Sequence, residues 1–161
     1  MIPRAFTIDP VGSDRDLDDA VALIRAYAAA LPIDLTYQDF EAEIAAMPGK
    51  YAPPAGALLL ARGDDGAALG CVGLRPLSGP GDCEMKRLYV APAGRGLGVG
   101  RGLVAAIVTA ARRAGYRRML LDTLPSMQAA MALYEGAGFA TIPAYYDTPV
   151  AGTRFMALAL R

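Results

Sequence analysis

The sequence contains no histidine, and this absence removes several classes of catalytic site. Ser-His-Asp and Cys-His systems need an imidazole as general base, and most zinc sites use imidazole ligands. Cysteine is scarce as well, because Cys71 and Cys83 are the only two. A catalytic cysteine needs a neighbour that lowers its pKa, and no histidine can do so. We therefore expect the general base to be a carboxylate, a tyrosine, a lysine or water.

Long apolar runs are also missing. The two longest, residues 26–33 and 103–111, fall well short of the ~20 residues that a membrane helix needs. The N-terminal residues lead into a series of aspartates without an apolar segment of the kind that directs export. We therefore expect a soluble, cytoplasmic protein with no membrane partner.

The formal charges cancel over the whole chain, but they are unevenly distributed. Acidic side chains predominate in residues 1–50, whereas Glu84 is the only acidic residue of the arginine-rich segment 84–118. A basic centre suits an anionic cofactor, and an acidic N-terminal region would attract a cationic amine. The absence of net positive charge and of a basic-aromatic stripe argues against a nucleic-acid partner.

A chain of 161 residues has the size of one domain, and no linker or repeat divides it, so we assign residues 1–161 to a single domain. Apolar periodicity, caps and turn residues predict the elements. Strands are expected at 4–8, 57–62, 68–77, 83–90, 118–123, 139–142 and 155–160. Helices are expected between Ser13 and Pro32, over 37–47 and 99–114, and from 125 to 136 or 138.

The expected strands 57–62, 68–77 and 83–90 form an antiparallel meander, with Gly-Asp-Asp-Gly at 63–66 as its first turn. In this register Cys71 faces roughly Tyr89 rather than Cys83, so a disulfide is not expected. Strict alternation along the third strand predicts two faces: Glu84, Lys86, Leu88 and Val90 on one, and Met85, Arg87 and Tyr89 on the other. The unit of strand, helix and strand from 83 to 123 requires parallel pairing of its two strands.

A glycine-rich segment, Arg95-Gly96-Leu97-Gly98-Val99-Gly100-Arg101, links the strand 83–90 to the helix 99–114. The start of a helix presents unpaired amides and the positive end of the helix dipole, which together bind anions. Glycines let the main chain approach a phosphate closely and adopt positive φ. The sequence therefore predicts a pyrophosphate site over residues 95–101.

Other glycine loops fit less well. A P-loop needs a lysine after its glycines, and Gly-x-Gly-x-x-Gly fails from Gly96 because the sixth position is Arg101. The pattern Gly-x-Gly-x-x-Ala does fit residues 100–105, with Asp122 where a ribose-binding acid would lie. Since Gly100 comes ten residues after Val90 instead of ending the strand, a dinucleotide-binding domain is the weaker alternative.

Residues 95–100 resemble the Arg/Gln-x-x-Gly-x-Gly/Ala signature of the GCN5-related N-acetyltransferase (GNAT) family, which binds the pyrophosphate of coenzyme A. Residues 133–139, Leu-Tyr-Glu-Gly-Ala-Gly-Phe, resemble the family's Leu-Tyr-Glu-x-x-Gly-Phe, and they follow in the expected order. The resemblance implies the α/β GNAT fold. This fold is a mixed, largely antiparallel sheet of about seven strands, with a central parallel pair formed by the fourth and fifth strands and about four helices on both faces.

The resemblance also implies direct transfer of acetyl from acetyl-CoA to an amine of a small molecule or peptide, without an acyl-enzyme or a metal. A homodimer is left open. Main-chain groups of the strand would pair with pantetheine and stabilise the oxyanion, and the loop would bind the pyrophosphate. The implied cofactor-binding residues are Leu88, Tyr89, Val90, Arg95, Gly96, Leu97, Gly98, Val99, Gly100 and Arg101.

Tyr134 matches the family's tyrosine and is the predicted general acid that protonates the coenzyme A thiolate. Glu84 is the predicted base, directly or through a water. An ion pair of Glu84 with Lys86 and an amine that arrives neutral are the alternatives to this role.

For the acceptor amine, the predicted contacts are Tyr37 and Tyr146, the latter in a late aromatic loop. Many family members have an asparagine where this chain has Met127, so one polar contact to the cofactor is missing. A non-catalytic coenzyme A-binding or sensor domain is the alternative function.

Overall fold

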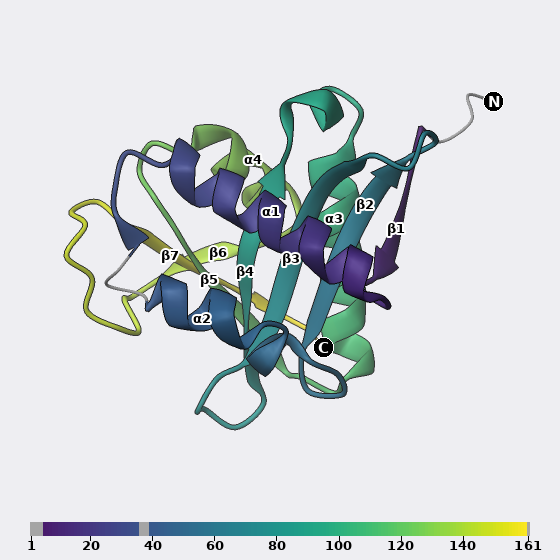
Figure 1. The fold of residues 1–161 in the computed structure, drawn as a ribbon. Helices are drawn as coiled ribbons and strands as arrows, with labels where there is room; N and C mark the ends of the chain where they lie inside the picture. Colours follow the sequence, from purple (N-terminus) through teal and green to yellow (C-terminus); the bar gives the residue numbers. More distant parts are fainter. Residues whose placement is uncertain (1–4, 36–38, 161) are drawn as a thin grey trace.

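The computed structural model describes residues 5–35 and 39–160. Its strands are β1 (Phe6–Pro10), β2 (Ala57–Gly63), β3 (Ala68–Pro76), β4 (Asp82–Val90), β5 (Arg118–Thr123), β6 (Ala140–Ile142) and β7 (Arg154–Ala159). Its helices are α1 (Asp14–Ala30), α2 (Phe40–Ala46), α3 (Val99–Arg113) and α4 (Gln128–Gly136), with short 3₁₀ turns at Gly49–Tyr51 and Pro92–Gly94. The predicted order of elements is confirmed (Figure 1).

Within the described residues these strands form one seven-stranded sheet in the order β1-β2-β3-β4-β5-β7-β6. All neighbouring strands are antiparallel except β4 and β5, which are parallel and are connected through α3. The β4–β5 ladder is short, because only 82–84 of β4 pair with 118–120 of β5. The remaining residues of β4 and β5 have no ladder between them, so the sheet is split in its middle.

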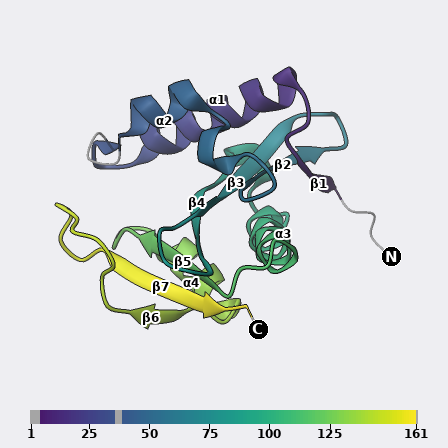
Figure 2. The same cartoon turned by 90° about the horizontal axis from the view of Figure 1, so that it is seen from below.

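Helices cover both faces of the sheet, as expected (Figure 2). α1 and α2 lie over one face, where Ile24, Phe40 and Ile44 belong to one buried cluster. α3 and α4 share the opposite face, where Ile107 and Tyr134 belong to a second cluster. The sheet therefore separates two hydrophobic cores.

Local capping explains where α1 begins and ends. Ser13 has an extended conformation, and its hydroxyl accepts a hydrogen bond from the amide of Asp16 at 3.1 Å, as predicted for the cap. Asp14 and Asp16 in the first turn face the positive end of the helix dipole. The helix stops before Pro32, whose ring cannot continue it.

Several predicted boundaries differ by a few residues in the structure, mostly at strand ends. β1 starts at Phe6 because its pairing with β2 runs from Phe6–Gly63 to Pro10–Leu59. α2 starts at Phe40, and the predicted start at 37 lies outside the described residues. α4 starts at Gln128, because residues 124–127 form a turn closed by the Met127 amide and the Leu124 carbonyl. α3 ends at Arg113, one residue before the predicted end, and its C-cap Ala114 is exposed.

A β-bulge in β4 makes the predicted alternation of its side chains wrong. Cys71 pairs with Tyr89, as expected, but Gly73 pairs with Lys86, so two residues of β4 stand opposite one of β3. The bulge contains Arg87, whose φ is 61°. Such an insertion inverts the alternation beyond it.

The bulge separates residues that were expected to share a face. Leu88 and Val90 pack with Met85 against the core under α3, whereas Tyr89 packs against the core under α1. Glu84 and Lys86 therefore lie on the face opposite Leu88 and Val90. Both cysteines are buried and free, as predicted.

None of the helices in residues 5–35 and 39–160 is long and apolar enough to cross a bilayer.

Candidate active site

The split between β4 and β5 contains a narrow pocket of about 30 Å³. Leu88 lines it from β4, Asp122 and Thr123 line it from β5, and Tyr134 lines it from α4. Past Glu84, the edge of β4 that faces β5 has no strand partner. Main-chain groups on such an edge can pair with an extended ligand in the way that an added strand does.

The predicted strand residues lie along this edge, but their side chains point to different places. Val90 packs toward the core under α3, and the ring of Tyr89 meets Tyr27 of α1 edge to face at 6.2 Å between centroids. Their side chains hold the strand between the two cores, which leaves the backbone as the part that can bind a ligand.

The predicted pyrophosphate loop follows β4 and leads into α3. Gly96 and Gly98 have φ values of 79° and 83°, and a Cβ atom at either position would meet nothing within 4 Å. These two glycines are therefore required by backbone conformation and not by packing. Val99 is buried, which anchors the start of the helix, while Leu97 is 46% exposed.

Gly98 is the N-cap of α3, and the first bond of the helix joins the Gly102 amide to the Gly98 carbonyl at 3.0 Å. The amides of the first turn precede this bond, so none of them has an acceptor within the helix. Arg95 and Arg101 are exposed on either side of them. The loop thus combines unpaired amides, a helix dipole and two cations, which is a favourable combination for an anion.

Gly100, a predicted cofactor-binding residue, also has a role in packing. A Cβ atom there would lie 3.0 Å from Leu133 of α4, so this glycine allows α3 and α4 to approach each other. Residues 100–105 lie inside α3, whereas a dinucleotide fingerprint needs its first glycines in the turn between strand and helix. This geometry argues against the dinucleotide-binding alternative.

Tyr134 is 6% exposed and packs against Phe139, with 5.9 Å between ring centroids. Burial raises the pKa of its phenol well above the usual value, and the charge of Asp122 adds to this rise. The phenol therefore stays protonated at neutral pH. A protonated tyrosine that lines the pocket can serve as a proton donor there.

Glu84 is buried and engaged by two partners. One of its oxygens accepts a hydrogen bond from Arg75 Nε at 2.8 Å, and the other accepts one from the hydroxyl of Tyr145. Glu84 lines a neighbouring pocket of about 390 Å³ together with Tyr145 and Tyr146. To act as a base, Glu84 would have to give up one of these two hydrogen bonds so that the oxygen can accept a proton.

Tyr146, a predicted acceptor contact, belongs to the late loop, residues 143–153, between β6 and β7. Its hydroxyl donates a hydrogen bond to Asp122, and Lys86 Nζ lies 3.4 Å from the other oxygen of the same carboxylate. Sequence analysis assigned Asp122 only to the dinucleotide alternative. Asp122 lies near the carboxyl end of a central parallel strand, and ligands bind at such ends in open sheets. This position could have identified it as a site residue. The other predicted contact, Tyr37, lies outside the described residues.

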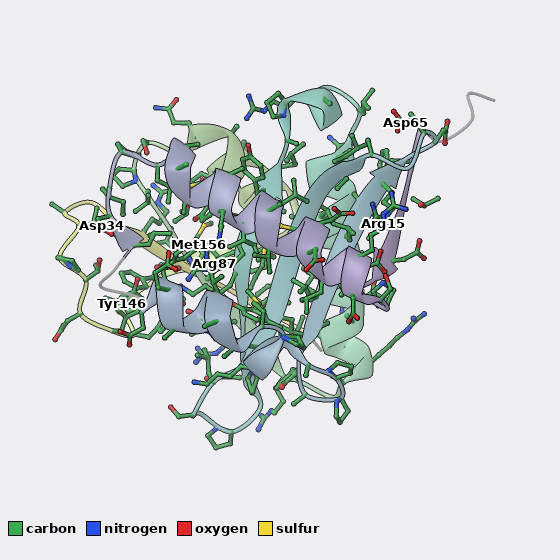
Figure 3. The ribbon with its side chains drawn as sticks, in the orientation of Figure 1. Arg15, Asp34, Asp65, Arg87, Tyr146 and Met156 are labelled. Atoms are coloured by element: carbon green, nitrogen blue, oxygen red, sulfur yellow. The ribbon has the colours of Figure 1, made fainter. Side chains whose placement is uncertain are left out.

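A set of ion pairs from α2 holds the bulge of β4. Glu43 accepts a 2.8 Å hydrogen bond from Arg87 Nε and lies 3.5 Å from Arg75. The guanidinium of Arg87 stacks over Phe40 at 5.2 Å from the ring centroid. Figure 3 shows the label of Arg87 between the ribbons of α1 and α2, and that of Tyr146, a residue of the late loop, beside α2. Glu43 and Arg75 were not predicted as site residues, because no pattern along the chain indicates that these two charged side chains meet.

Comparison with known proteins gives a consistent result. The family model described as "Acetyltransferase (GNAT) family" matches residues 21–139. An uncharacterized N-acetyltransferase of Schizosaccharomyces pombe is 42% identical over 160 residues, covering 99% of this chain and 98% of its own.

Solved structures show the same fold. A protein from Klebsiella pneumoniae, provisionally assigned as an acyl-CoA N-acyltransferase, has a TM-score of 0.76 and 30% identity, covering 99% of this chain and 100% of its own. The Salmonella typhimurium protein yncA, solved with its cofactor acetyl-CoA, has a TM-score of 0.65 and 23% identity, covering 98% of this chain and 95% of its own.

Proposed function

Because the chain belongs to the acetyltransferase (GNAT) family, we propose that it transfers an acetyl group from acetyl-CoA directly to an amine of a small molecule or peptide. The observation that carries this proposal is the continuity of the split between β4 and β5 with the exposed N-terminus of α3. An extended thioester donor with a diphosphate needs both features in this order.

The residues present fit such a donor. The free edge of β4 suits the amides of pantetheine, which would lie between the split strands as an added strand. The space beside Gly96 and Gly98 is open where a Cβ atom would stand, so a phosphate can approach the main chain. The acetyl-CoA of the Salmonella protein supports the choice of donor by analogy of fold.

Main-chain and side-chain groups of the site then have separate roles in acyl transfer. A main-chain amide of β4 near Leu88 to Val90 donates a hydrogen bond to the thioester oxygen, where negative charge develops. Tyr134 donates its proton to the sulfur as the carbon–sulfur bond breaks. The amine must also lose a proton. Glu84, the predicted base, would take it only through a water, because Arg75 and Tyr145 occupy its two oxygens. No cysteine takes part, since burial raises the pKa of both thiols to about 12.

Two measurements test the proposal. Calorimetry should show binding of acetyl-CoA and coenzyme A but not of NAD, and thiol release should rise with at least one member of a broad amine panel. Binding without turnover on the whole panel would support the coenzyme A-binding or sensor alternative. A protein that ignores coenzyme A would refute the donor site itself.

A further inference from the structure

The late loop holds two neighbouring strands through two consecutive tyrosines. The hydroxyl of Tyr145 donates to Glu84 of β4, and that of Tyr146 donates to Asp122 of β5. Their rings meet each other edge to face at 5.6 Å, and each meets Phe155 at 5.2 Å. In each pair a tyrosine hydroxyl thus donates to a carboxylate, and the pairs differ in position and in the cation beside them.

The positions differ with respect to the split in the sheet. Glu84 pairs with Leu120 in the last rung of the β4–β5 ladder, whereas Asp122 lies two residues beyond that rung. Asp122 therefore borders the pocket that also contains Tyr134 and Leu88, and Glu84 borders only the neighbouring pocket with Arg75 and Tyr145. Of these two carboxylates, Asp122 lies closer to the place where the thioester would react.

The cations that hold the two carboxylates differ as well. Arg75 grips Glu84 through Nε and a terminal nitrogen, both at 2.8 Å, and the Glu84 side chain is 2% exposed. Lys86 lies 3.4 Å from Asp122, whose side chain is 10% exposed. An incoming ammonium can replace this longer contact more easily than it can separate Glu84 from a guanidinium.

The charged and titratable groups around Asp122 come from four elements. They are Lys86 and Arg87 of β4, Tyr145 and Tyr146 of the late loop, Tyr134 of α4 and Tyr27 of α1. The Lys86 ammonium and the Tyr146 hydroxyl both contact the carboxylate of Asp122. Tyr134 lines the same pocket and keeps its proton, because burial raises its pKa.

We propose that Asp122 is the catalytic base of the acetyl transfer, and that Tyr146 is a positioning residue that orients its carboxylate. This inference rests on the proposed function. An ammonium ion gives its first proton to Asp122, which releases it to solvent. The neutral nitrogen forms the bond to the acetyl carbon, and its second proton passes to Asp122. The carbon–sulfur bond breaks, and the sulfur takes the proton of Tyr134. Proton transfer from Asp122 to the tyrosinate restores both groups.

The test compares variants of the Tyr146–Asp122 pair with variants of the Tyr145–Glu84 pair. Thiol release is measured at saturating acetyl-CoA over a range of pH, with an amine that the wild-type protein acetylates. Asp122→Asn should lower kcat at neutral pH by roughly 10²-fold, within the usual range for loss of a general base. Its rate should rise at higher pH as the free amine loses its proton unaided, and Asp122→Glu should restore part of the activity. Tyr146→Phe should lower kcat with little change in the KM for acetyl-CoA, and Tyr145→Phe should have a smaller effect.

Asp122→Asn leaves the buried ammonium of Lys86 without its carboxylate partner, which can destabilise the fold. The double variant Asp122→Asn/Lys86→Gln removes this unpaired charge, and its rate is measured in the same way. A spectroscopic measurement needs no amine substrate. The pKa of Tyr134 is obtained by titrating tyrosine absorbance at alkaline pH and subtracting the titration of the Tyr134→Phe protein. This pKa should be lower in Asp122→Asn, because the charge of Asp122 raises it in the wild type.

The outcomes separate the two proposals. A wild-type protein that binds acetyl-CoA but acetylates no amine overturns the proposed function and this inference with it. An active wild-type protein whose Asp122→Asn variant keeps its rate and pH profile overturns the inference alone. A larger loss in Glu84→Gln than in Asp122→Asn assigns the base to Glu84 and also overturns it.

Discussion

The donor side and the acceptor side of the site are built in different ways. The donor side comes from consecutive elements, β4, the glycine loop, α3, β5 and α4, within residues 82–136. The proposed acceptor side consists of side chains from α2, β3 and the late loop. Glu43 contacts Arg75 of β3 and Arg87 of β4, and Tyr146 contacts Asp122 of β5. A site made of consecutive backbone leaves a motif in the sequence, and a site made of distant side chains does not.

The largest effect should follow from a change in the donor loop. Gly98→Leu puts a side chain at φ 83° where the diphosphate would lie, and each charge-assisted hydrogen bond lost costs about 1.5–3 kcal/mol. Calorimetry should therefore detect little or no binding of acetyl-CoA.

Gly66 offers a matched control for Gly98, because its φ is 84° and a Cβ atom there would also meet nothing within 4 Å. Gly66→Leu should carry the same backbone strain, about 1–2 kcal/mol, in a hairpin turn. Its affinity for acetyl-CoA should stay that of the wild type. Equal losses in both variants would mean that the loop does not bind the donor.

On the acceptor side, Glu43→Gln should destabilise the fold strongly. Arg87, whose side chain is 2% exposed, would lose its carboxylate, and breaking a buried ion pair costs about 3–5 kcal/mol. Thermal unfolding measures this loss. Glu41→Gln on the same helix is the control, since its pair with Arg25 is exposed and is worth about 0–1 kcal/mol. Similar midpoints for the two variants would show that the acceptor side does not depend on this contact.

Tyr134→Phe should separate chemistry from binding on the donor side. The aromatic packing against Phe139 is retained, so acetyl-CoA affinity should change little. Turnover should fall by about 10²-fold, because the leaving thiolate has lost its proton donor. Steady-state kinetics and calorimetry together check this expectation, and an unchanged turnover would remove Tyr134 from its role.

The smallest effect should be a loss of stability at alkaline pH. Burial raises the pKa of Tyr134 and of Tyr145 above the ordinary tyrosine value of 10.0. The unfolded chain therefore releases these protons first, and their contribution to stability is present below about pH 10 and declines above it. Unfolding by urea at several pH values should show this decline. It should be shallower in Tyr134→Phe, and an equally steep decline would contradict the assignment.

Much of the fold was predictable because its signals are local. The Ser13 cap, the Gly-Asp-Asp-Gly turn at 63–66 and the apolar period of α3 each act within a few residues. The bulge at Arg87 was not predictable, since it depends on how β4 pairs with β3 and on the contact of Arg87 with Glu43, which is far away in the sequence. For the same reason the predicted grouping of Glu84 with Leu88 failed.

The family, the order of the elements and the glycine loop could be read from the chain alone, because neighbouring residues specify caps, turns and positive φ. The folded arrangement was needed to show which carboxylate borders the split between β4 and β5, which cation holds each carboxylate, and where Tyr146 points. Those contacts depend on Coulomb attraction and hydrogen bonds between residues of different strands and loops, and such interactions form only when packing brings the partners within a few ångströms.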